Sequence, residues 1–179
     1  MVSATKLQPQ QAEPTLSLHA LSVGDGILAL SRAPGAGGDY AADLRLIHEW
    51  RPSMVISMTT RVEHVILGVE TLGTDIQGLG SRWFHMPVED YQTPTKDLED
   101  HWHQVSALAR QALSGGGRVL VHCRGGCGRS GMAVLRLMIE SGEPPDAALA
   151  RLRALRPCAV ETDAQMAWAY GRRRQAPPA

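Results

Sequence analysis

Residues 118–130 read Arg-Val-Leu-Val-His-Cys-Arg-Gly-Gly-Cys-Gly-Arg-Ser. The apolar residues 119–121 favour a buried strand, and the apolar-rich run 132–139 favours a helix. Between them, Cys123 and Arg129 are separated by five residues, three of which are glycine. The pattern therefore predicts a strand, a tight loop and a helix, with a nucleophile where the loop begins and a cation where it ends.

The loop between Cys123 and Arg129 has the composition of an anion-binding turn. Backbone N–H groups at a helix N-terminus can hold a phosphate. Gly125, Gly126 and Gly128 allow the backbone to curl so that its amides point inward. Arg129 can clamp two phosphate oxygens, and the same positive field should keep Cys123 as the nucleophilic thiolate. We therefore expect phosphate-monoester hydrolysis through a phosphocysteine.

Neighbouring residues complete the predicted loop. Ser130 can hydrogen-bond the sulfur and help it leave in the second step, and His122 is expected to hold the loop and tune the thiolate. For Arg124, substrate recognition and a solvated position are both consistent with the sequence. The predicted phosphate-binding set is Arg124, Gly125, Gly126, Cys127, Gly128 and Arg129.

The oxygen that leaves phosphorus needs a proton, and a carboxylic acid on another loop is the usual source. Asp90 is the candidate, in the segment 87–94 that reads Pro-Val-Glu-Asp-Tyr-Gln-Thr-Pro. This segment follows a predicted strand and has proline at both ends. Glu89 is the rival, although strand-like alternation should turn Glu89 and Asp90 in opposite directions.

A third segment, 156–165, joins the last two predicted helices and reads Arg-Pro-Cys-Ala-Val-Glu-Thr-Asp-Ala-Gln. An amide such as Gln165 can orient the water that attacks the phosphocysteine. Glu161 can anchor the segment through hydrogen bonds. We therefore expect the catalytic set to be Cys123, Arg129, Asp90, Ser130 and Gln165.

Strand-like and helix-like segments alternate along the chain. Strands are predicted at 27–30, 54–58, 82–86 and 118–122, and helices at 39–50, 62–69, 97–113, 129–141, 145–155 and 161–173, whereas the glycine-rich residues 71–81 favour neither. Such alternation is typical of an α/β fold with a mostly parallel sheet covered on both faces. Ligands bind such sheets beyond the carboxyl ends of the strands, where the glycine-rich loop should lie.

The composition limits the classes of protein to be considered. The chain has 179 residues, enough for one domain, and its formal net charge of zero argues against a general nucleic-acid binder. Residues 1–11 lack the apolar core of a signal peptide, and no run is long enough to span a bilayer. We expect a flexible tail over 1–20, one phosphatase domain over 21–174, a frayed tail over 175–179 and a monomer.

The three cysteines, Cys123, Cys127 and Cys158, do not suggest the disulfide framework of a secreted protein. They suit a reducing compartment in which thiols stay free, so a cytoplasmic location is expected. His122, Cys123 and Cys127 lack a zinc spacing, and a metal would quench the nucleophile. Neither a metal nor another cofactor is expected.

Together these motifs resemble the cysteine-based protein tyrosine phosphatase superfamily. The signature of this superfamily is a His-Cys pair, then any five residues, then Arg followed by Ser or Thr. Residues 122–130 match it in full. The segment 87–94 resembles the general-acid loop of the compact dual-specificity group, and the segment 156–165 resembles the last loop of that group. Residues 28–35 match the beginning of the kinase-associated phosphatase (cyclin-dependent kinase inhibitor) subfamily. The resemblance implies a central twisted sheet of four or five strands flanked by helices. It also implies metal-free hydrolysis, either of phosphotyrosine alone or of phosphotyrosine together with phosphoserine or phosphothreonine.

The chain departs from the family pattern at two cysteines. Cys127 takes a position that is often leucine, and Cys158 replaces the glycine of Arg-Pro-Gly-Ala-Ile-Glu-Thr. An oxidised Cys123 can form a protective disulfide with Cys158 or Cys127. We favour the simpler interpretation that both are small residues tolerated as free thiols, because a disulfide needs a Cα spacing that the sequence does not show.

Two other functions share parts of this pattern. A phosphatase of phosphoinositides or of another non-protein phosphate ester would use the same chemistry, but the loop carries Arg124 and no lysine. A non-catalytic phosphate-binding pseudophosphatase usually lacks the cysteine, the arginine or the acid, whereas this chain keeps Cys123, Arg129 and Asp90. We therefore expect an active enzyme whose partner is a phosphorylated protein or peptide.

Overall fold

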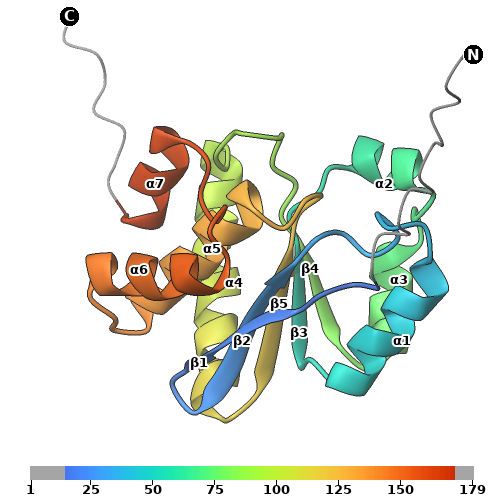
Figure 1. Ribbon diagram of the computed structural model, residues 1–179, viewed down its shortest axis with the longest axis horizontal. Coiled ribbons are helices and arrows are strands. Elements are labelled where there is room, and N and C mark those ends of the chain that lie inside the picture. Colours follow the sequence, from blue (N-terminus) through green and yellow to red (C-terminus); the bar gives the residue numbers. More distant parts are fainter. Residues whose placement is uncertain (1–14, 172–179) are drawn as a thin grey trace, which may run out of the picture.

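The fold is built on one five-stranded sheet with helices on both faces, in a computed structural model that describes residues 15–171 (Figure 1). The strands are β1 (His19–Val23), β2 (Gly26–Ser31), β3 (Met54–Ser57), β4 (Arg82–His85) and β5 (Arg118–His122). The helices are α1 (Tyr40–Trp50), α2 (Arg61–Leu67), α3 (Leu72–Gly78), α4 (Lys96–Ser114), α5 (Gly128–Glu140), α6 (Pro145–Leu155) and α7 (Asp163–Ala169). The predicted α/β class is confirmed.

The register of the sheet brings the ends of four strands together. The strand order is β1-β2-β5-β3-β4, and only the β1–β2 pair is antiparallel. Ser31 and Ser57 both pair with His122, and His85 pairs with Ser57. Because these residues end their strands, the loops that follow β2, β3, β4 and β5 all open at the same edge of the sheet.

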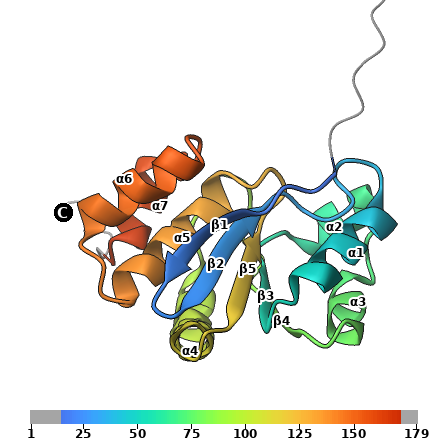
Figure 2. The ribbon, with the colours of Figure 1, turned by 60° about the horizontal axis from the view of Figure 1, so that its bottom comes forward.

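Alternating side chains divide the interior into two apolar cores. Along β5, Val119 and Val121 join one core and Leu120 joins the other. Helices α4–α7 cover the first face of the sheet and α1–α3 cover the second (Figures 1 and 2). Residues 128–138 of α5 are all buried, so the helix that follows the glycine-rich loop is held from every side.

Two elements, β1 and α3, were not predicted, and one boundary was wrong. The tail predicted over 1–20 overlaps β1, and Leu16 is buried with its N–H donating to the Asp43 carboxylate at 3.1 Å. Residues 15–20 therefore belong to the folded domain. The rest of that tail and the frayed tail predicted over 175–179 lie outside the described residues.

Every helix within residues 15–171 is too short or too polar to cross a lipid bilayer.

Candidate active site

The loop between β5 and α5 turns its carbonyl groups outward. The N–H of Ala33 donates to the carbonyl of Arg124 at 3.1 Å. The guanidinium of Arg156 donates to the carbonyls of Gly125 and Gly126 at 3.2 and 3.1 Å. Because the C=O and N–H groups of a trans peptide point in opposite directions, these bonds aim the following N–H groups toward the centre of the loop. The result is an anion cradle of the predicted kind.

The sulfur of Cys123 lies inside this cradle. The side chain is 3 % exposed, and the N–H of Gly126 donates to its Sγ at 3.2 Å. The hydroxyl of Ser130 lies 3.2 Å from the same sulfur. Both contacts can hydrogen-bond the sulfur as it attacks phosphorus and later as it leaves.

Gly126 is required by the close approach of the loop to the end of β2. Its φ is +73°, and a Cβ at this position would lie 2.6 Å from the carbonyl carbon of Ser31 and from the nitrogen of Arg32. Both are backbone atoms that cannot move aside. Gly125, by contrast, has open space around its missing side chain, so the two neighbouring glycines are under different constraints.

Hydrogen bonds to helix α2 fix Arg129 and leave one edge of its guanidinium facing the catalytic loop's interior for a ligand. It is 2 % exposed, and its Nη1 and Nη2 donate to the two carboxylate oxygens of Glu63, each at 2.8 Å. Nη1 also donates to the carbonyl of Val88 at 2.8 Å. Within residues 15–171, the buried Nε of Arg129 has no hydrogen-bond partner. The edge formed by Nε and Nη2 can therefore receive two phosphate oxygens.

Glu63 was not predicted as a site residue. Its only sequence signal is the capping box that it forms with Thr60 at the start of α2. Although burial opposes ionisation, hydrogen bonds from Arg129 and from the Thr60 N–H lower the pKa of Glu63. Burial also opposes the charge of Arg129, but the hydrogen bond to Glu63 raises the pKa of the guanidinium. The pair therefore stays ionised, and the carboxylate fixes the arginine in place.

His122 lies at the end of a hydrogen-bonded chain behind the loop. The indole N–H of Trp83 donates to Ser57 Oγ at 2.8 Å, and Ser57 Oγ lies 2.5 Å from His122 Nε2. The other ring nitrogen, Nδ1, lies 3.4 Å from the carbonyl of Cys123. Complete burial lowers the pKa of His122 to about 3. A neutral ring that accepts from Ser57 and donates to Cys123 satisfies every group in this chain.

Asp90 lies beside Arg129 on an exposed loop. Its Oδ1 is 3.5 Å from Arg129 Nη2 and accepts the N–H of Tyr91 at 3.1 Å. The Asp90 side chain is 59 % exposed. Tyr91 has a φ of +61°, which is uncommon for a residue with a side chain and re-aims the backbone directly after Asp90. Of the two rival carboxylates, Asp90 is the one that the structure brings to Arg129.

Gln165, in the first turn of α7, and Glu161, just before that helix, approach the loop together. Gln165 is fully buried, and its Oε1 accepts the N–H of Glu161 at 2.9 Å. Its Nε2 donates to the carbonyl of Gln92 on the Asp90 loop at 3.3 Å. A Cβ at Gly128 would lie 3.0 Å from Gln165 Oε1. Gln165 thus bonds to the Asp90 loop and to Glu161 and lies beside Gly128. The carboxylate of the exposed Glu161 lies beside Gly128 as well, with Oε1 2.8 Å from the same hypothetical Cβ.

The cysteines other than Cys123 correct a sequence-based prediction. Cys127 and Cys158 form a disulfide with their Cα atoms 5.2 Å apart, and Cys123 is the free cysteine. The favoured interpretation of two free thiols was wrong, and Cys123 takes no part in the disulfide. The disulfide ties the residue that caps α5 to the segment that carries Arg156.

The comparisons with known proteins agree with this geometry. A family model described as "PTP-SAK: Swiss Army Knife protein, DSP-PTPase phosphatase domain" matches residues 54–168. The chain belongs to this family. The match covers more than half of the sequence and includes Asp90, the glycine-rich loop and Gln165, so the resemblance to compact dual-specificity phosphatases is confirmed.

Solved structures share the fold. A kinase associated phosphatase with its catalytic cysteine changed to serine is 22 % identical, with a TM-score of 0.77, covering 88 % of this chain and 94 % of that one. Human DUSP28 is 20 % identical, with a TM-score of 0.61 and coverages of 89 % and 93 %. PTPMT1 in complex with PI(5)P is 19 % identical, with a TM-score of 0.64 and coverages of 85 % and 92 %. No curated protein matches the sequence.

Proposed function

We propose that this protein hydrolyses phosphotyrosine, and also phosphoserine or phosphothreonine, in phosphoproteins through a phosphocysteine on Cys123 and without a metal. The observation that carries the proposal is the cradle itself. Inward N–H groups surround a buried sulfur, and Arg129 offers the unpartnered Nε edge described above. A phosphate oxygen would satisfy that buried N–H, which otherwise costs free energy.

In the first step, Cys123 Sγ attacks phosphorus, and the phosphorus–sulfur bond forms as the bond to the leaving oxygen breaks. The loop N–H groups and Arg129 take up the phosphoryl oxygens, where charge is held in the transition state. Protonated Asp90 gives its proton to the leaving oxygen. The bond between Arg129 and Glu63 keeps the guanidinium aligned during this step.

In the second step, water attacks the phosphocysteine and the sulfur leaves as a thiolate. Asp90, now a carboxylate, accepts a proton from the water. Gln165 Oε1 already accepts one N–H and has a second lone pair for that water. Ser130 Oγ donates to the departing sulfur, and His122 supports the loop from behind.

The phosphoinositide alternative has a specific observation in its favour. PTPMT1, one of the similar structures, was determined in complex with PI(5)P. The exposed Arg124 on the catalytic loop can serve an acidic head group as well as a phosphopeptide. Comparing rates on phosphopeptides and on phosphoinositides presented in vesicles separates the two substrate classes. The non-catalytic alternative predicts binding of inorganic phosphate without turnover.

The cytoplasmic location and monomeric state belong to the same proposal. Free thiols can no longer be used as evidence for a cytoplasmic location, because Cys127 and Cys158 form a disulfide.

The test is hydrolysis of p-nitrophenyl phosphate by the full chain and by Cys123→Ser. Loss of a covalent nucleophile is expected to lower kcat by roughly 10⁴-fold or more. Binding of inorganic phosphate, measured by calorimetry, should survive in Cys123→Ser because the cradle remains. Vanadate should inhibit the wild type and EDTA should not. Full activity in Cys123→Ser, or loss of wild-type activity in EDTA, would overturn the mechanism.

A further inference from the structure

The exposed large apolar side chains within residues 15–171 gather around the catalytic site. Val62, Val65 and Ile66 lie on α2 and are 68, 61 and 60 % exposed, and Tyr91 lies on the Asp90 loop and is 57 % exposed. Apolar surface left in water costs free energy, and a cluster of such side chains marks a surface that another molecule covers. Because α2 and the Asp90 loop both contact Arg129, this cluster belongs to the rim of the catalytic site.

Three of these side chains form a ridge along one side of α2. Val65 and Ile66 follow Val62 by three and four residues, the spacing that puts side chains on one face of a helix. Glu63 lies between them in the sequence but turns inward, where it is buried and accepts the hydrogen bonds of Arg129. The α2 ridge, defined as Val62, Val65 and Ile66, is therefore the outer face of the helix that fixes the catalytic arginine.

Arg129 connects both apolar surfaces to the phosphate cradle. Tyr91 follows Asp90, whose Oδ1 is 3.5 Å from Arg129 Nη2, and the ridge flanks Glu63, whose Oε1 is 2.8 Å from the same nitrogen. Cys123 is only 3 % exposed, so a phosphorylated side chain must enter the cradle to reach it. Entry brings the neighbouring residues of the substrate onto the surrounding rim. The molecule that covers the exposed apolar side chains is therefore the substrate itself.

We propose that the α2 ridge and Tyr91 bind large apolar side chains of the substrate protein, so that the preferred substrate carries aliphatic or aromatic residues close to its phosphorylated residue. This inference rests on the proposed function and narrows its substrate class. The cradle recognises the phosphate, which every substrate shares. The rim recognises the sequence around it, because burial of apolar side chains on both partners adds binding free energy away from phosphorus.

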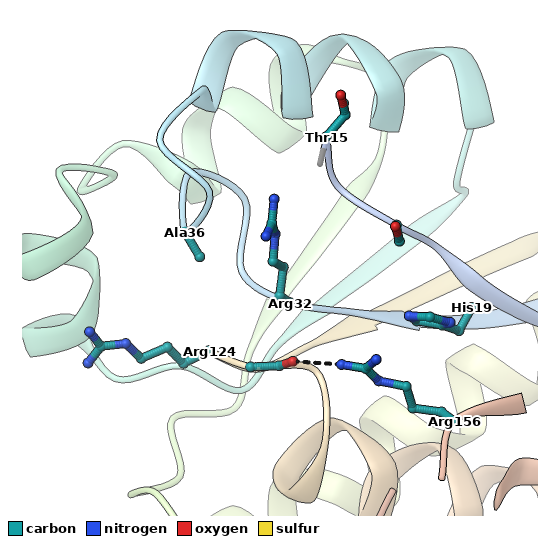
Figure 3. Close-up of a pocket in the computed structure, with 8 residues that line it drawn as sticks. Thr15, His19, Arg32, Ala36, Arg124 and Arg156 are labelled. Carbon is teal, nitrogen blue, oxygen red and sulfur yellow. Dashed lines mark hydrogen bonds between the residues drawn. The ribbon is translucent and has the colours of Figure 1, made fainter. Parts of the chain in front are cut away.

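The charges around this apolar rim favour a protein over a membrane. Arg124 extends from the catalytic loop away from Arg156, toward the side of the loop on which α2 lies (Figures 1 and 3). Attraction to an anionic membrane needs a cluster of Lys and Arg, whereas the rim has two cations and three anions. These exposed side chains are Arg61, Glu70, Glu89, Asp90 and Arg124. Such a mixture has no net positive charge to offer to lipid head groups, and it suits a polypeptide.

The experiment moves one leucine through a phosphotyrosine peptide. The reference peptide has serine at every flanking position, and each test peptide has leucine at one of the five positions on either side of phosphotyrosine. Wild-type kcat/KM should be about tenfold higher for the best leucine peptide than for the reference, which corresponds to about 1.4 kcal/mol, as expected for an aliphatic side chain that is partly buried. All peptides have the same charge, so electrostatic attraction contributes equally to every rate.

The double variant Val65→Thr with Ile66→Thr should bring the ratio between the leucine and reference peptides close to one. Threonine keeps the β-branched shape and adds a hydroxyl, and the ratio within one variant cancels any change in the cradle. Ala107→Ser is the matched control, since it adds a hydroxyl at an exposed position of α4 on the other face of the sheet; it should leave the ratio unchanged. If the double variant fails to fold, Val62→Thr should lower the same ratio.

The outcomes separate this inference from the proposed function. Hydrolysis of all peptides with equal kcat/KM, or a leucine preference that survives in the double variant and in Val62→Thr, would overturn the apolar rim and leave the proposed function intact. Equal peptide rates together with wild-type binding to phosphatidylserine vesicles that the double variant loses would assign the ridge to lipid instead. Turnover of p-nitrophenyl phosphate with no peptide hydrolysed would overturn the protein substrate and this inference together.

Discussion

The catalytic loop and the Asp90 loop meet at Arg129, yet they are held very differently. In the catalytic loop, Cys123 and Gly126 are buried, and outward carbonyls accept hydrogen bonds from Arg156 and from the N–H of Ala33. In the segment 87–94, Asp90 and Tyr91 are exposed, and the anchors come from Arg129 and Gln165. One loop is part of the packed interior, and the other lies on its surface.

This difference separates two requirements of the chemistry. A cradle that stabilises charge must be fixed before the substrate arrives, because reorganisation would cost part of its effect. An acid that gives and later takes a proton needs access to the leaving group and to water. Changes at the buried positions of the catalytic loop should therefore affect stability and activity together, whereas changes at the exposed positions of the Asp90 loop should affect activity alone.

The largest expected effect is on catalysis, from Asp90→Asn. The amide cannot donate the proton, so kcat on a phosphotyrosine peptide should fall by roughly 10²–10⁴-fold. The loss should be smaller for p-nitrophenyl phosphate, whose leaving group needs little protonation. The free energy of unfolding should change by less than about 0.5 kcal/mol, because the side chain is exposed.

Glu89→Gln is the matched control for Asp90→Asn, since it neutralises the neighbouring exposed carboxylate. It should keep nearly full activity. Equal losses in the two variants would assign the acid elsewhere, and an unfolded Asp90→Asn would contradict the surface character of this loop.

The next effect is on stability, from Cys158→Ser. The disulfide joins residues 31 positions apart, and a closed loop of that size stabilises a fold by roughly 3–4 kcal/mol in the chain-entropy model. Denaturant unfolding of the oxidised protein should show this loss. Cys127→Ser and the double variant should lose the same amount, because all three remove one bond. Three free thiols in the oxidised wild type, found by peptide mapping, would contradict the bond.

A smaller effect is expected from one methyl group in the catalytic loop. Gly126→Ala puts a Cβ against the backbone at the end of β2 at a positive φ, which should cost about 2–3 kcal/mol of stability and most of the activity. Gly125→Ala adds the same group where space is open, and it should fold like the wild type. Thermal unfolding and p-nitrophenyl phosphate assays of both variants test the contrast. Equal tolerance at the two positions would mean that the loop is not packed as described.

The difference between local and long-range contacts explains which features could be predicted from the sequence. The strand, loop and helix around Cys123 are contiguous, so local apolar periodicity and glycine spacing were enough. Glu63 and Arg156 act across the fold, and no local pattern links either one to the catalytic loop. The disulfide was missed for the same reason, because its Cα spacing of 5.2 Å exists only after the catalytic loop and the 156–165 segment have packed together.

The missed elements also depend on packing. In α3 the glycines argue against a helix, but Leu72 and Ile76 are fully buried under the sheet, and burial overrides intrinsic propensity. In β1 the strand is short and lies at the edge of the sheet, where Leu21 and Val23 alone face the core. Both elements were placed by contacts that a single sequence does not display.

The smallest expected effect is the pH dependence that His122 gives to stability. Its pKa of about 3 in the folded state lies below the ordinary value of 6.5, so the unfolded chain takes up the proton first. This contribution is complete above pH 6.5 and is lost as the pH falls toward 3; at pH 5 the loss is about 2 kcal/mol. Between pH 7 and pH 5, wild type should therefore lose about 2 kcal/mol more of its unfolding free energy than His122→Gln. Equal losses would mean that this ring is not kept neutral behind the catalytic loop.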